Sequence, residues 1–181
     1  MAYHRFEAEI ERGPYRPYRE VLRACTARAA EEIRLPISGD DLDVLANFWE
    51  EQPVFDDVAP ALRELRSEDW KLAVLTNCDD DLFARTQTTL PVRLDRVVTA
   101  QQVRAYKPAL AHFRRFDELT KGRAQWIHVA VSWFHDIAPA REYGVGRIWI
   151  DRDRTGEDPA AANRVLASLE NLCDALRNLD L

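Results

Sequence analysis

Four short apolar runs, set between stretches of helical periodicity, constrain the fold of this chain most strongly. They cover residues 72–76, 97–99, 126–131 and 147–150. Each is too short for a core helix and is apolar almost throughout, as expected of a strand covered on both faces. Strands that alternate with helices predict an α/β fold with a parallel, Rossmann-like sheet. Ligands of such sheets bind beyond the carboxyl ends of the strands, so the residues after each run are the candidates for a site.

The rest of the sequence has mostly helical periodicity and divides into two parts. The first fifty residues read as helical, with a break at Pro36 and Gly39 and a following apolar face of Leu42, Leu45 and Trp49. Later helices are expected near residues 58–65, from 79 onward, and over 109–119, 134–143 and 158–179. We therefore expect a helical part over residues 1–52 and a sheet-bearing core over 53–181.

Composition excludes several classes of partner. The net charge is -6 and no run of Lys or Arg occurs, which argues against nucleic acid and anionic membranes. No apolar run is long enough to span a bilayer, and the first residues lack a signal-peptide pattern. The cysteines, Cys25, Cys78 and Cys173, are odd in number and widely spaced. They fit free thiols in a reducing compartment better than disulfides or a zinc site, so we expect a cytoplasmic protein.

The first predicted strand ends in Thr76 and Asn77, and three acidic residues follow Cys78 at a helix start. A hydroxyl, an amide and the exposed N–H groups of a helix start can together hold an anion. The same residue types are common helix caps, and capping alone is the simpler explanation of this stretch.

The second strand leads to Lys107, directly before Pro108, which fits the first position of a helix. A lysine held beside an anion site can neutralise a carboxylate nucleophile and a transferring anionic group. The alternative is a solvated surface lysine, the commoner situation for a lone Lys.

The third strand is followed by Ser132 and Asp136, four residues apart at a strand-to-helix turn, so both can face one crevice. Asp136 has several open roles: it can hold Lys107, orient water, bind a metal or stabilise the helix N-terminus. His135 lies between them, and a histidine in this aromatic setting is more often a structural hydrogen bonder than an acid–base catalyst.

Thr/Asn, Lys and Asp thus follow three successive strands in order. That layout resembles motifs two, three and four of the haloacid dehalogenase superfamily. The runs PVFDDVAPALRELR, KLAVLTNCDDDLF, VVTAQQVRAYKP and HVAVSWFHDIAPAREYGVGRIWIDR resemble its type II branch almost phrase by phrase. Residues 1–52 resemble the later part of that family's helical cap. The resemblance implies a Rossmann-like core with a partial helical cap over the active site.

The resemblance also implies roles for individual residues. Thr76 and Asn77 would form the leaving-group and substrate-anion site, Lys107 would balance the charge of the nucleophile, and Ser132 with Asp136 would form the fourth motif. Family chemistry has two steps: an aspartate attacks carbon or phosphorus, and water cleaves the covalent intermediate. The implied substrate is a small anion, either a 2-haloacid or a phosphate monoester. Phosphatase members need Mg²⁺ and 2-haloacid dehalogenases need no metal, so the cofactor stays open, and no residue is assigned to a metal.

Two departures from the family pattern stand out. Val131 and Trp133 occupy places where well-formed dehalogenases carry polar residues. The first motif, a strand ending in Asp before a Gly-Thr turn, has no counterpart in residues 1–30. Asp151, Asp153 and Thr155 have that motif's spacing, as a circular permutation would produce, although the family's last core strand fits this place better. Asp56 and Asp57 have no strand before them and are interpreted as a helix cap.

In the family the first strand is central in the sheet. Its absence predicts unpaired strand edges that a chain would cover by dimerising or by rearranging. We expect a shortened gene model, in which the chain is a hydrolase or a fragment of one and the nucleophilic Asp is absent. Two alternatives stay open: a catalytically inactive protein that binds a small anion, and a module that interacts by forming a homodimer.

Overall fold

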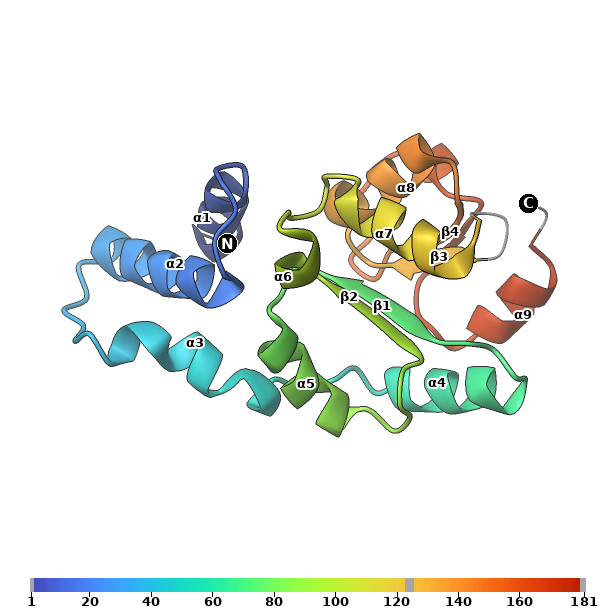
Figure 1. Ribbon diagram of the computed structural model, residues 1–181, viewed down its shortest axis with the longest axis horizontal. Helices are drawn as coiled ribbons and strands as arrows, with labels where there is room; N and C mark the ends of the chain where they lie inside the picture. The colour runs from blue at the N-terminus through green and yellow to red at the C-terminus, as the bar shows by residue number, and fades with distance from the viewer. Residues whose placement is uncertain (1, 123–125, 180–181) are drawn as a thin grey trace.

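The computed structural model describes residues 2–122 and 126–179, and it has an α/β fold with two parallel sheets (Figure 1). The first sheet pairs β1 (Ala73–Thr76) with β2 (Arg96–Thr99). The second has the order β3 (Ile127–Ala130), β4 (Gly146–Ile150), β5 (Arg164–Leu166). The four predicted strands are therefore confirmed, and no strand among the described residues joins the two sheets.

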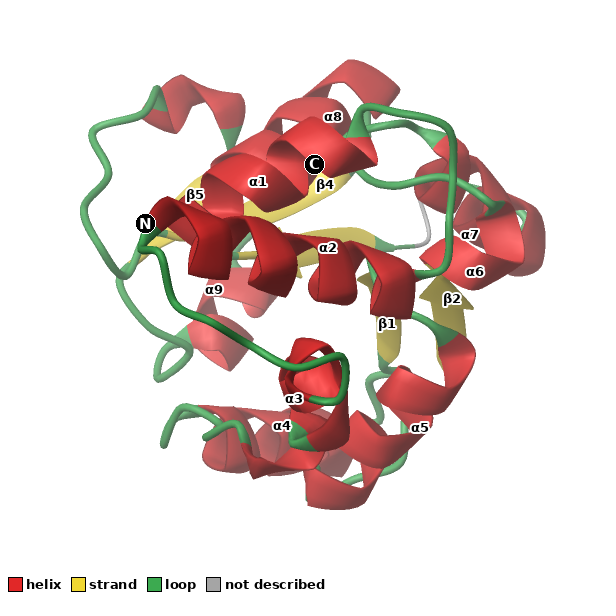
Figure 2. Cartoon of the chain, turned by 90° about the vertical axis from the view of Figure 1, so that its left-hand side faces the viewer, coloured by secondary structure: helices red, strands yellow, loops and turns green. Residues whose placement is uncertain are grey.

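The chain begins with helices, as the sequence predicts. Helices α1 (Ala2–Glu11) and α2 (Tyr18–Glu32) pack side by side (Figure 2). The helix expected around residues 42–49 is instead a series of short helical turns: a 3-10 turn at Asp41–Asp43, α3 (Val44–Asn47) and a 3-10 turn at Trp49–Glu51. Asp and Asn recur in this segment, and these residues compete with helical hydrogen bonding and favour turns.

Helices connect the strands of the core, because parallel neighbours need a crossover rather than a tight turn. They are α4 (Val58–Ser67) before β1, α5 (Asp80–Thr89) between β1 and β2, α6 (Ala100–Val103) and α7 (Ala111–Thr120) between β2 and β3, a π-helical turn (Trp133–Ile137) and α8 (Ala138–Tyr143) between β3 and β4, and α9 (Leu172–Arg177) after β5. No helix in the described part is long and apolar enough to cross a membrane.

The prediction of one helix over residues 158–179 is wrong. The segment contains a 3-10 turn at Pro159–Ala161, then strand β5, and only then helix α9. Val165 lies opposite Trp149 of β4 in a parallel ladder. A short apolar run fits the period of a helix as well as that of a strand. The free edge of β4 favours the strand, because it offers hydrogen-bond partners to an extended segment.

The prediction that Asp57 caps a helix through its side chain is wrong. Asp57 occupies the position before α4, but its side chain makes no capping hydrogen bond there. Its carboxylate instead accepts hydrogen bonds from the Arg152 side chain and the Leu169 backbone, each at 2.8 Å. Asp57 thus ties the start of α4 to the segments that follow β4 and β5.

Strand β4 is buried on both faces, as its continuous apolar run predicts: Ile148, Trp149 and Ile150 are each at most 1% exposed. Replacing Ile148 by Ala removes buried methyl groups and leaves a cavity, so we expect the free energy of unfolding to fall by about 2–5 kcal/mol. Val165→Ala, at a position 37% exposed, is the control and should change it by about 1 kcal/mol or less. Urea titration measures both, and equal losses would contradict this description of the core.

Candidate active site

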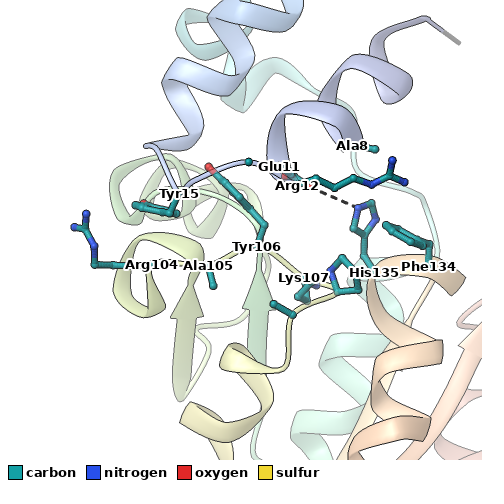
Figure 3. A pocket seen from close by; sticks show the side chains of 13 residues that line it. Ala8, Glu11, Arg12, Tyr15, Arg104, Ala105, Tyr106, Lys107, Phe134 and His135 are labelled. Atoms are coloured by element: carbon teal, nitrogen blue, oxygen red, sulfur yellow. Dashed lines mark ion pairs between the residues drawn. The ribbon is translucent and has the colours of Figure 1, made fainter.

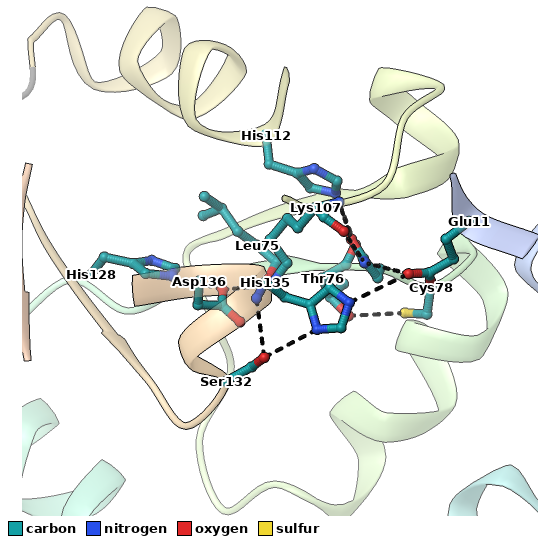
Figure 4. Close-up of polar contacts among 11 residues, drawn as sticks. Glu11, Leu75, Thr76, Cys78, Lys107, His112, His128, Ser132, His135 and Asp136 are labelled. Atoms are coloured by element: carbon teal, nitrogen blue, oxygen red, sulfur yellow. Dashed lines mark hydrogen bonds and ion pairs between the residues drawn. The ribbon is translucent and has the colours of Figure 1, made fainter. Parts of the chain in front are cut away.

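The residues that follow β1, β2 and β3 meet at one place, with Lys107 at its centre (Figure 4). Lys107 is 7% exposed, so the alternative of a solvated surface lysine is wrong. Its ammonium donates to Asp136 Oδ1 at 2.7 Å and to the backbone oxygen of Leu75 at 2.8 Å. Leu75 belongs to β1 and Asp136 follows β3, so this one charge links the two sheets.

Asp136 is the counter-charge of Lys107. The same Oδ1 atom also contacts Nε2 of His128 at 2.8 Å. Burial by itself raises the pKa of Asp136, but the attraction of Lys107 and the hydrogen bond from His128 outweigh it and hold the pKa well below its usual range. Of the roles left open by the sequence, holding Lys107 is therefore the one that the geometry supports.

Asn77 fixes the backbone of Lys107. Its Oδ1 accepts from the Lys107 N–H at 2.7 Å, and its Nδ2 donates to the Lys107 carbonyl at 3.1 Å. These paired bonds hold the loop after α6 against the end of β1. Thr76 is directed elsewhere, because its hydroxyl contacts Cys78 Sγ at 3.4 Å.

Ser132 caps the π-helical turn: its Oγ accepts from the His135 N–H at 3.1 Å and lies 3.0 Å from His135 Nδ1. The turn matters for the site because the N–H groups of Asp136 and Ile137 both bond the Ser132 carbonyl. An extra residue in a helical turn changes the direction of the side chains around it. In this structure, Ser132 and Asp136 line the same cavity, as the sequence predicts for this pair.

Two residues of this site were not predicted. His128 is a polar residue inside the apolar third strand, and that break in the pattern is the signal that could have identified it. Glu11 gave no signal, since it reaches the site from α1 across a large separation in sequence. Its Oε2 lies 3.6 Å from His135 Nε2 and 3.4 Å from Asn77 Nδ2.

Two cavities open at this place and share Glu11, Lys107 and His135. The smaller one, of about 160 Å³, contains the charged groups and is lined by Glu7, Glu11, Asn77, Lys107, Ser132, His135 and Asp136. The larger one, of about 400 Å³, has walls that include Tyr15, Tyr106 and Phe134, with Arg12 and Arg104 also lining it (Figure 3). Four of the five predicted residues thus line the small cavity, and Thr76 lines neither of the two.

The described residues around Lys107 do not fit a magnesium ion. Asp136 Oδ1 is shared by an ammonium and an imidazole, and a lysine ammonium occupies the position beside it. In the part of the chain that the structure describes, three potential metal ligands converge only at Glu64, Glu68 and Cys173, on helices α4 and α9.

No protein-family model matches the sequence, and no curated protein matches it by sequence. Solved structures do match the fold. An L-2-haloacid dehalogenase superposes with a TM-score of 0.88 at 19% identity, covering 97% of this chain and 83% of that one. An L-2-haloacid dehalogenase from Xanthobacter autotrophicus with chloropropionic acid covalently bound gives 0.86 at 18% identity, covering 99% and 85%. A HAD phosphatase from Thermococcus onnurineus gives 0.66 at 22% identity, covering 96% and 78%. The chain therefore has the haloacid-dehalogenase fold.

Removing either partner of the Lys107–Asp136 pair leaves an uncompensated buried charge. We expect Lys107→Met to lower the free energy of unfolding by about 3–5 kcal/mol. The double variant with Asp136→Asn should lose less than the sum of the two single variants, because it leaves neither charge unpaired. Urea unfolding of the four proteins measures this coupling, and strictly additive losses would contradict it.

The low pKa of Asp136 also predicts how its contribution depends on pH. Between its pKa in the folded state and its ordinary value of 3.8, the unfolded chain binds the extra proton. The stability that ionised Asp136 contributes is therefore complete above the ordinary value and is lost as pH falls toward the folded value. We expect the stability gap between wild type and Asp136→Asn to narrow on acidification in urea titrations. A constant gap would contradict the assignment.

Proposed function

We propose that this protein is a hydrolase of small anionic substrates, either a 2-haloacid or a phosphate monoester. The observation that carries the proposal is the buried ammonium of Lys107, held at the strand ends beside the small cavity. A fixed positive charge in a site shielded from water stabilises the negative charge that shifts between nucleophile and leaving group. The similar structures include L-2-haloacid dehalogenases and a HAD phosphatase, which supports both substrate classes, and the higher TM-scores of the dehalogenases favour the 2-haloacid.

The proposed roles follow from the geometry. Lys107 would attract the substrate anion and balance the charge of the nucleophile, while Asp136 holds the Lys107 side chain in place. Asn77 positions the Lys107 backbone, and its amide borders the same cavity. Ser132 offers a hydroxyl to the bound anion. Thr76 stays a predicted substrate contact, and its hydroxyl would have to turn away from Cys78 to reach an anion.

The chemistry needs a carboxylate nucleophile. Its oxygen would attack C2 of the haloacid as the carbon–halogen bond breaks and its electron pair leaves with the halide. Water would then hydrolyse the ester, releasing a 2-hydroxy acid and restoring the carboxylate. In our proposal this group is an aspartate outside the described residues. Asp136 is committed to Lys107 and His128, and Asp151 accepts a hydrogen bond from the Thr155 N–H in its own turn.

A second candidate function is binding of a small anion without turnover. It is favoured by the commitment of Asp136 to Lys107 and His128, which makes this carboxylate unsuited to act as the nucleophile. A third is a homodimer that covers sheet edges, since no described strand joins β1 and β3. Sedimentation distinguishes the last case, because a monomer contradicts it. The buried free thiols support the cytoplasm as the proposed compartment.

Turnover tests the hydrolase. Halide release from 2-chloropropionate and phosphate release from a monoester should each be assayed for wild type and Lys107→Ala. Loss of a preorganised charge should lower the turnover of the true substrate by about 100-fold or more. Lys71→Ala, a lysine outside both cavities, is the control and should keep wild-type activity. Activity that survives loss of both Lys107 and Asp136 would sink the proposal.

Sequencing the DNA directly upstream of Met1 tests the source of the nucleophile. An in-frame apolar run ending in Asp and a Gly-Thr turn would support the hydrolase, which should then be assayed with that segment. A stop codon directly upstream would favour the binding protein, for which we expect saturable binding of phosphate or a carboxylate without product.

A further inference from the structure

Glu11 brings a second carboxylate into the anion site. It is the last residue of α1, and its side chain is 5% exposed. The carboxylate points toward the imidazole of His135 (Figure 4). Its Oε2 also lies 3.4 Å from Asn77 Nδ2. It lines both cavities, so it stands where the small cavity meets the larger one.

The groups near Glu11 are those that a bound anion would use. Asn77, His135 and Lys107, each of which carries a nitrogen donor, all line the small cavity. An anionic substrate beside them would have a like charge as its neighbour, in surroundings where water screens the repulsion poorly. Ionised Glu11 and a substrate anion therefore compete for one set of donors and one positive charge.

Glu11 is held loosely for a buried carboxylate. Its contacts of 3.4 and 3.6 Å are long for charged hydrogen bonds. In the described structure, buried Nε2 of His135 has no hydrogen-bond partner within range, although Glu11 is directed at it. Releasing this carboxylate from its neighbours, or protonating it, therefore breaks no strong bond.

We propose that Glu11 sets the anion affinity of the site: when ionised it competes with the substrate anion, and when protonated it yields the donors to it. This inference rests on the proposed function, because it concerns the same cavity. Glu11 is then a specificity-determining residue, because it disfavours any anion that binds while the Glu11 carboxylate is still charged.

The surroundings of Glu11 support this role. Burial raises the pKa of Glu11 above its ordinary value, and neighbouring Glu7 raises it further, while His135 and Lys107 oppose the shift. The titratable and charged groups that face it are Glu7 on its own helix, Cys25 on α2, Lys107 and Tyr106 on the loop after α6, and His135 and Asp136 on the π-helical turn. Burial raises the pKa of both the Cys25 thiol and the Tyr106 phenol, so neither contributes a charge.

Sulfate is a suitable probe, because it is not hydrolysed and its charge does not change between mildly acidic and neutral solution. We expect Glu11→Gln to bind sulfate about tenfold more tightly than wild type at neutral pH, within the usual range for coupled sites. Wild-type affinity should rise as pH falls through the Glu11 pKa, and the variant should lack this part of the response. His135 and Asp136 are present in both proteins, so the part of the pH response that Glu11→Gln removes is assigned to Glu11.

Calorimetry on the full chain measures these affinities. The control is Glu9→Gln, which removes the same charge from the same helix at an exposed position paired with Arg28, and it should bind sulfate as wild type does. If Glu11→Gln and wild type bind sulfate equally while Lys107→Ala does not bind, the role of Glu11 is wrong and the anion site stands. If no protein binds sulfate at any pH, the proposed function fails and this inference with it. The pH response of wild type needs no variant, and a flat one would also overturn the proposal.

Discussion

The ammonium of Lys107 is the interaction on which the rest of this structure depends. It lies between a backbone oxygen of β1 and the carboxylate that follows β3, so it spans the space between two sheets that no described strand connects. Burying a charge has a large desolvation cost, and it is tolerated only when partners surround it. Asn77 binds the backbone of Lys107 and Asp136 binds its side chain. His128 in turn forms a hydrogen bond with Asp136. The chemistry of the site and the cohesion of the fold thus rest on the same atoms.

A second buried carboxylate, that of Asp79, attaches helix α2 to the start of helix α5. Asp79 lies just before α5, yet its carboxylate accepts from the N–H groups of Tyr18 and Arg19 at 2.9 and 3.0 Å. The first N–H groups of a helix have no partner within it, so Asp79 caps a helix that is distant in sequence. The Tyr106 hydroxyl adds a bond to the Arg16 carbonyl at 2.7 Å. The beginning of α2 is therefore anchored beside the loop that carries Lys107.

The sequence predicts those parts of the structure that depend on local patterns. Apolar runs identify the four strands, and the rule that strand ends converge brings Asn77, Lys107 and Asp136 together. It fails where partners are distant: nothing near Asp79 shows that it caps another helix, and nothing in α1 singles out Glu11. It also fails for β5, because Arg164–Leu166 fits two periods and only the edge of β4 selects one. The assignments of residues 1–52 as a cap and 53–181 as the core, and the roles of the site residues, stay predictions.

The π-helical turn at Trp133–Ile137 has a consequence for how this site can vary. The position of Ser132 is set by the end of β3, and the position of α8 is set by its packing. The π-helical turn connects the two with one more residue than an α-helical turn would need. Deleting one residue there would restore ordinary α-helical winding, and the turn would no longer connect β3 and α8 in their present positions. Asp136 would then rotate by roughly 100° about the helix axis relative to Ser132, since each α-helical residue turns through that angle. The pairing of lysine and aspartate is thus sensitive to chain length in this turn.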